Sequence, residues 1–228
     1  MATGLRLPEL RDIEHATQIV PPHWVDDDAI LATQRRHRRL SFERFADGTL
    51  LVTPPPGWKS GVRNTELVWQ VTAWAKAGHP GLVMGPGGGV GFDDGALLAP
   101  DATYISKRRW AAADHARTFA YAVPDAVFEV LSQTDRIATT RRKLRTYLSN
   151  GVTLAVLIDC WRRHVYVGCW GDADTRDLGW IDRLDCAPAM PGFVLDLAAV
   201  CAASDVKDEH SDQRDCCRED TGDHPPQP

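Results

Sequence analysis

The chain has 228 residues, of which 43% are hydrophobic and 25% are charged, a composition typical of a globular protein. The length suits one domain with a substantial core. No apolar run approaches the roughly 20 residues that a membrane-spanning helix needs. The N-terminal stretch MATGLRLPELRDIEH lacks the basic start and apolar core of a signal peptide. We therefore expect a cytoplasmic protein that makes no membrane contact.

The formal net charge of −5 is unevenly distributed. Residues 1–34 carry six acidic and two basic residues, and residues 205–228 carry eight acidic and three basic ones. The body between them is mildly basic, with a net charge of +4. This charge is compatible with a polyanionic substrate, although ordinary surface charge is the simpler interpretation of it.

The cysteines show no metal-binding or redox motif. Four of the six are widely spaced in foldable sequence, Cys216 and Cys217 are adjacent in the polar tail, and no CxxC pair occurs. A zinc knuckle or a thioredoxin-like site is therefore not predicted. We expect free thiols, in keeping with a cytoplasmic location.

The pattern divides the chain into three parts. Residues 1–34 are weakly patterned and predict an N-terminal extension, with one short helix after Asp26–Asp28. Residues 35–203 are the foldable body. Residues 204–228 are polar, charged and end in prolines, which predicts a disordered acidic tail.

Within the body, turn residues separate strands from helices. Two hairpins are predicted, with turns at Asp47–Gly48 and Asp94–Gly95. An apolar stripe predicts a helix between them, from about residue 62 to Gly78. A strand DAVFEVLS, a helix over about 135–149 and two strands, TLAVLID and RHVYVGCW, follow; MPGFVLDLAAV closes the core. This order predicts an α/β fold, a mixed central sheet with one helix on each face.

Two carboxylates interrupt predicted strands. Glu129 lies in the apolar stretch AVFEVLS, and Asp101 lies in ALLAPDATYIS after a proline that cannot donate to a sheet ladder. A buried carboxylate is costly unless a partner charge, a metal or hydrogen bonds replace its water. A divalent cation held between the two acids would remove their repulsion, and Mg²⁺ is commonly held in this way. The alternatives are that Asp101 caps a turn and that Glu129 pairs with a buried basic residue.

The helix after Glu129 supplies positive charge. Lys143 lies at the border of its predicted buried stripe and could reach the carboxylates, where it could orient water or stabilise a transition state. A solvated position in a charge run is the alternative. Arg136, Arg141, Arg142 and Arg145 are interpreted as solvated or phosphate-facing. Glu43 and Tyr147 are interpreted as structural, and Trp58, Trp69 and Trp74 as core or loop anchors rather than base-stacking residues.

Several motifs together resemble a known family. PDATYIS, PDAVFEVLS, KLRTYLSNGV and LAVLID, with FERFADGTLLVTPPPGW and GVRNTEL upstream and MPGFVLDL downstream, are similar in order and spacing to the Uma-two family of proposed restriction endonucleases. That family belongs to the PD-(D/E)XK nuclease superfamily. The resemblance spans roughly residues 40–200, and its strength lies in the order of the motifs, because each one alone is short.

The resemblance implies a restriction-endonuclease-like fold and a set of site residues. Asp101 and Glu129 would be the paired ligands of Mg²⁺ or Mn²⁺, and Glu66 would be an additional acid near the metal. Leu131 stands where the superfamily pattern has its lysine, and Lys143 would be the migrated replacement. Glu66 on an amphipathic helix could equally be solvated.

We therefore expect a metal-dependent endonuclease that hydrolyses DNA, with Asp101, Glu129 and Lys143 as its catalytic residues and Arg136, Arg141, Arg142 and Arg145 as backbone contacts. Nucleases of this kind often dimerise to cut both strands, so a homodimer is one option, although the sequence itself is silent on the oligomeric state. Two alternatives remain open: an inactive binding module on the same fold, and a hydrolase of another phosphodiester such as RNA.

Overall fold

The computed structural model describes residues 13–205. Its centre is a six-stranded mixed sheet in the order β11-β10-β9-β8-β7-β4. The neighbours β8 (Ala126–Val130) and β9 (Leu154–Asp159) are parallel, and every other pair in this sheet is antiparallel. The remaining strands of this sheet are β4 (Gly81–Met84), β7 (Ala102–Ser106), β10 (His164–Cys169) and β11 (Arg176–Asp177).

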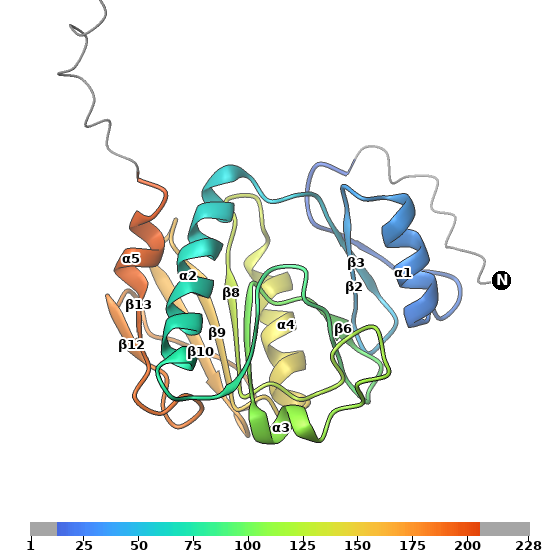
Figure 1. Cartoon of the computed structure of the whole chain (residues 1–228). Coiled ribbons are helices and arrows are strands. Elements are labelled where there is room, and N and C mark those ends of the chain that lie inside the picture. The colour runs from blue at the N-terminus through green and yellow to red at the C-terminus, as the bar shows by residue number, and fades with distance from the viewer. Residues whose placement is uncertain (1–12, 206–228) are drawn as a thin grey trace, which may run out of the picture.

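One long helix covers each face of this sheet, as the sequence predicted (Figure 1). Because side chains alternate along a strand, β8 contributes Phe128 to one apolar cluster and Val127 to the other. Helix α2 (Trp58–Lys76) packs on the Phe128 side through Leu67. Helix α4 (Ile137–Ser149) packs on the Val127 side, and the two faces together bury the main core.

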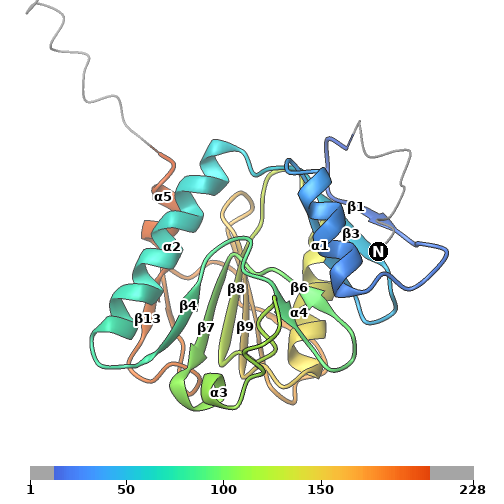
Figure 2. The same cartoon turned by 45° about the vertical axis from the view of Figure 1, so that its right-hand side comes forward.

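The first hairpin, like the β5–β6 hairpin around Asp94–Gly95, lies outside the central sheet, which differs from the single sheet that the sequence predicted. Its strands belong to a second, five-stranded sheet in the order β1-β3-β2-β6-β5, which lies beside α4 and α1 (Figure 2). The two predicted turns are present, each with a glycine at positive φ, Gly48 at 83° and Gly95 at 89°. The strands are β1 (Thr17–Ile19), β2 (Ser41–Arg44), β3 (Leu50–Thr53), β5 (Val90–Gly91) and β6 (Leu97–Leu98).

The N-terminal extension is more ordered than its weak pattern indicated. Residues 17–19 form β1, and α1 (Asp27–Arg36) begins with Asp26, whose side chain accepts from Ala29 N at 2.8 Å. Ile30 of α1 is buried in the cluster beneath the second sheet. Only residues 1–12 of the predicted extension, and residues 206–228 of the predicted tail, lie outside the described part of the chain.

The C-terminal elements close the α2 face. Strands β12 (Arg183–Asp185) and β13 (Val194–Asp196) form a small ribbon, followed by α5 (Leu197–Ala202) against α2. A short helix, α3 (Lys107–Ala111), occupies the connection between β7 and β8. Within residues 13–205 the structure contains no helix long and apolar enough to cross a membrane.

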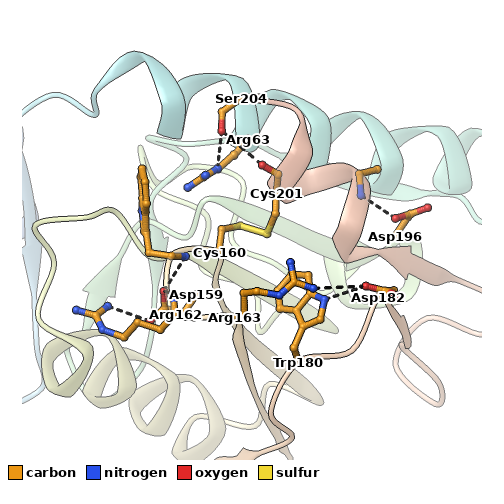
Figure 3. The surroundings of a disulfide bond; sticks show 12 residues. Arg63, Asp159, Cys160, Arg162, Arg163, Trp180, Asp182, Asp196, Cys201 and Ser204 are labelled. Carbon is orange, nitrogen blue, oxygen red and sulfur yellow. Dashed lines mark hydrogen bonds and ion pairs between the residues drawn. A yellow bond between two sulfur atoms is a disulfide. The ribbon is translucent and has the colours of Figure 1, made fainter. Parts of the chain in front are cut away.

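The prediction of free thiols is wrong for two cysteines. Cys160, at the end of β9, forms a disulfide with Cys201 of α5 across 41 residues of sequence (Figure 3). Cys169 and Cys186 are free, and Cys216 and Cys217 lie outside the described residues. Cysteine spacing could not reveal this pair, because it depends on α5 folding back onto the end of the central sheet.

Candidate active site

Lys143 is the centre of a buried cluster of charges. Its ammonium lies 2.7 Å from Glu129 Oε1 in β8 and 2.9 Å from Glu43 Oε1 in β2. All three side chains are at most 7% exposed. The strand–loop–helix segment from β8 to α4 thus brings Lys143 back to Glu129, as the hypothesis of a migrated lysine requires.

Asp101 lies beside this cluster, immediately before β7. Its Oδ2 accepts a hydrogen bond from Val130 N at 2.8 Å, and its Oδ1 accepts one from Asn64 Nδ2 of α2 at the same distance. Strand β7 is antiparallel to β8, with Ala102 opposite Phe128, so the start of β7 meets the end of β8. The two predicted metal ligands therefore lie at one edge of the central sheet.

Glu43 and Tyr147, which were interpreted as structural, are part of the cluster. Glu43 Oε1 also accepts from Ala99 N at 2.6 Å, two residues before Asp101. Tyr147, one turn after Lys143 on α4, donates its hydroxyl to Glu129 Oε1 at 2.7 Å. The signal for Glu43 was available in SFERF, where an acid interrupts a buried strand as Glu129 does.

Burial and mutual repulsion perturb the carboxyl groups. The pKa of Glu129 is raised to about 8, mainly by burial; the Lys143 ammonium opposes this shift, and the charges of Asp101 and Glu43 add to it. Burial raises the pKa of Asp101 to about 6, against the hydrogen bond from Val130 N and the charge of Lys143. Burial alone would lower the pKa of Lys143, but Glu129 and Glu43 outweigh it and raise that pKa. The ammonium therefore stays charged, whereas Asp101 and Glu129 take up protons at a higher pH than ordinary carboxyl groups do.

The donor set fits a divalent cation. When ionised, the three carboxylates exceed the charge of the single ammonium by two, and carboxylate oxygens are the ligands that Mg²⁺ prefers. Across residues 13–205, no three His, Cys, Asp or Glu side chains converge into a ready-made metal cage.

Glu66 does not join the cluster. Its Oε1 accepts from Gln70 Nε2 one turn later, and Gln70 in turn bonds Asp196 of β13. At 100° per residue, Glu66 lies about 200° around α2 from Asn64, the residue that bonds Asp101. The acid that the structure adds to Asp101 and Glu129 is Glu43.

The predicted phosphate-binding arginines of α4 are mostly engaged within the chain. Arg141 Nη2 lies 3.1 Å from Asp174 Oδ2, and Arg142 Nη2 lies 2.6 Å from Asp47 Oδ2. Arg145 is more exposed and lies 3.6 Å from Asp174, while Arg136 is exposed at the N-cap of α4. Arg136 and Arg145 are thus the freer two of the four.

The fold defines a class of protein, a mixed α/β domain whose fold a solved structure shares. The chain is similar to the crystal structure of a putative nuclease belonging to DUF820 from Anabaena variabilis ATCC 29413, with a TM-score of 0.61 and 16% identity, over 72% of this chain and 91% of that one. No curated protein matches the chain.

The family follows from the sequence match. The model of the Uma2 family, described as "Putative restriction endonuclease", matches residues 27–198. The chain therefore belongs to the Uma2 family. This confirms the family resemblance and the restriction-endonuclease-like fold that the motifs predicted.

Proposed function

We propose that the protein is a divalent-metal-dependent endonuclease that hydrolyses DNA. The observation that carries the proposal is the convergence of Lys143, Glu129 and Asp101 at one edge of the sheet, although they come from three separate elements. Membership of the Uma2 family supports nuclease chemistry.

Asp101 and Glu129 are the residues that would hold Mg²⁺ or Mn²⁺. The metal, when bound, would lower the pKa of a water molecule and neutralise charge on the phosphate. Asn64 and Val130 N fix Asp101, and Tyr147 fixes Glu129 through one oxygen. These bonds hold the carboxylates in place before substrate arrives.

Lys143 supplies a fixed positive charge. Its ammonium is held between Glu129 and Glu43, so its position does not depend on a flexible surface side chain. In the proposed reaction it orients the attacking water or stabilises the negative charge that develops at phosphorus. Glu43 positions Lys143 and is not proposed to contact the substrate.

The test is nicking of supercoiled plasmid by the wild type with Mg²⁺ or Mn²⁺, compared with Glu129→Gln and Lys143→Met. We expect nicking by the wild type that EDTA abolishes and both variants lack. Absence of nicking by the wild type, or equal nicking by Glu129→Gln, would refute the proposal. Activity on RNA but not on DNA would favour the other phosphodiester hydrolase.

Calorimetry separates an enzyme from an inactive module. Metal binding that disappears in Asp101→Asn and Glu129→Gln is expected for the enzyme, and binding of DNA without such metal binding would favour the module.

The proposed homodimer is tested by sedimentation. The proposed location is the cytoplasm, where a disulfide such as Cys160–Cys201 is uncommon; trapping thiols at lysis would show whether that pair is oxidised there.

A further inference from the structure

Two tryptophans and two cations gather beside the candidate active site. We call this group, Trp58, Lys59, Arg63 and Trp161, the tryptophan platform. Lys59 Nζ lies 5.6 Å from the ring centre of Trp58 and 5.3 Å from that of Trp161, and Arg63 Cζ lies 4.5 Å from the ring centre of Trp161. Trp58 is 64% exposed, which contradicts its interpretation as a core or loop anchor.

The platform contains buried polar atoms with no partner. Within residues 13–205, four buried side-chain nitrogen or oxygen atoms make no hydrogen bond, and three of them are Arg63 Nη1, Trp161 Nε1 and Asn64 Oδ1. Arg63 is only 5% exposed. Buried polar groups are normally satisfied, so the two unpaired atoms of the platform and the one of neighbouring Asn64 leave unused hydrogen-bonding capacity in this corner.

The platform adjoins the proposed catalytic carboxylates. Arg63 precedes Asn64, whose amide bonds Asp101. Trp161 follows the end of β9, and β9 runs parallel to β8 with Ile158 opposite Val130. The tryptophans and the carboxylates therefore lie at the same edge of the central sheet.

The surroundings hold the platform in place. Arg63 Nε donates to Ser204 Oγ at 3.1 Å, and the disulfide from Cys160 to Cys201 ties the residue before Trp161 to the helix before Ser204 (Figure 3). Asp159 Oδ1 accepts from Trp161 N at 3.1 Å. These contacts fix the Arg63 side chain and the backbone at Trp161, so this side of the platform is in place before a ligand arrives.

The charge of the platform is suited to an anion. Neither Lys59 nor Arg63 forms an ion pair within the described part of the chain; burial lowers the pKa of Arg63, while the nearby charges of Asp205 and Asp159 raise it. An exposed aromatic face next to cationic side chains is the combination by which proteins bind single-stranded nucleic acids, with bases stacked on rings and phosphates on cations.

We propose that the tryptophan platform binds an unpaired nucleotide of the substrate next to the cleaved phosphate, with its base on Trp58 and its phosphate at Lys59 and Arg63. The proposal rests on the proposed nuclease function and narrows its substrate to DNA with a single-stranded segment. Both faces of a base inside a duplex are covered by its neighbours, so an unpaired base is the form that can stack on Trp58.

The experiment measures fluorescence anisotropy of a labelled oligothymidylate of about 12 nucleotides, a span within the site sizes of single-strand binding proteins, and of a blunt duplex of equal length. EDTA prevents cleavage. The variants are Trp58→Ala and the matched control Trp69→Ala, which lies on the same helix and is also 64% exposed. Circular dichroism checks that each variant is folded.

We expect the wild type to prefer the single strand, Trp58→Ala to weaken that binding roughly tenfold or more, and Trp69→Ala to leave it within about twofold. Equal binding by the two variants would overturn the proposal, as would an equal loss on duplex and single strand. Plasmid nicking shows which of the two proposals is wrong. If the wild type nicks plasmid and Trp58→Ala binds the single strand normally, the proposal for the platform is refuted and the nuclease function stands. If binding of the single strand depends on Trp58 but the wild type does not nick plasmid, the nuclease function is refuted.

Discussion

Replacing Lys143 with methionine tests whether the cluster depends on its one cation. The ammonium is buried and lies within 2.9 Å of two carboxylates, so Lys143→Met keeps most of the side-chain volume and leaves those charges unpaired. Breaking a buried ion pair by removing one partner costs about 3–5 kcal/mol. That is a large share of the roughly 5–15 kcal/mol that stabilises a domain.

The cost should depend on pH. The Lys143 charge lowers the pKa of Asp101 and Glu129, so without it these pKa values rise in the folded protein. As the pH rises, the folded variant therefore keeps protons that the wild type has already released. Each further carboxyl group held protonated adds about 1.4 kcal/mol of destabilisation per pH unit. The variant should therefore be closest to the wild type at pH 5.5 and furthest from it at pH 8.5.

The assay is urea unfolding followed by tryptophan fluorescence at both pH values. Arg145→Met on the same helix is the control, because its ion pair with Asp174 is 3.6 Å long and partly exposed, and its loss should cost about 0–1 kcal/mol. Adding Glu129→Gln to Lys143→Met should restore part of the stability. The reasoning is refuted if Lys143→Met costs no more than the control at pH 8.5.

Three further predictions concern the same structure. The pKa of Glu129, about 8, exceeds the ordinary 4.5, so without metal the free energy of unfolding should fall as the pH rises from about 4.5 to 8. The Mg²⁺ affinity measured by calorimetry should increase from pH 6 to 8, because Asp101 and Glu129 lose their protons over this range. An affinity that does not change with pH would contradict the proposed ligands. Tyr147→Phe removes a hydrogen bond to Glu129 and should cost about 1–3 kcal/mol in urea unfolding. Closing a loop of 41 residues should stabilise by about 4 kcal/mol, so dithiothreitol should destabilise the wild type but not Cys160→Ser/Cys201→Ser; equal sensitivity would contradict the disulfide.

The predictable part of the fold is the part with strong local patterns. The Asp47–Gly48 and Asp94–Gly95 turns, the strand around Glu129 and the helix carrying Lys143 all followed from turn residues and apolar periodicity. The start of α2 at Trp58 was missed, because its first turn has a glycine N-cap and no capping side chain. The division into two sheets depends on long-range strand pairing that local pattern does not encode.

The site residues that could be predicted are those that interrupt the apolar pattern of their own strand or helix. Glu129 attracted attention as an acid in an apolar strand, and its contact with Lys143 followed from the short connection between β8 and α4. The role of Glu66 was inferred from the family resemblance. The helix period places Glu66 on the side of α2 away from Asn64, the residue that bonds Asp101. Glu43 also interrupts a buried strand, but its contact with Lys143 could not be predicted, because Lys143 is 100 residues away in the sequence and lies on the helix that covers the other sheet.

The ion pair between Glu43 and Lys143 has a consequence for the organisation of the domain. Glu43 belongs to the five-stranded sheet and Lys143 to the helix that covers the central sheet, so the charge cluster is also the joint between the two layers. A shift of one layer against the other would separate these charges at once. The alignment of the two sheets is therefore coupled to the arrangement of the proposed catalytic groups, and a shift of the hairpin that carries Glu43 would move the carboxylate that holds Lys143.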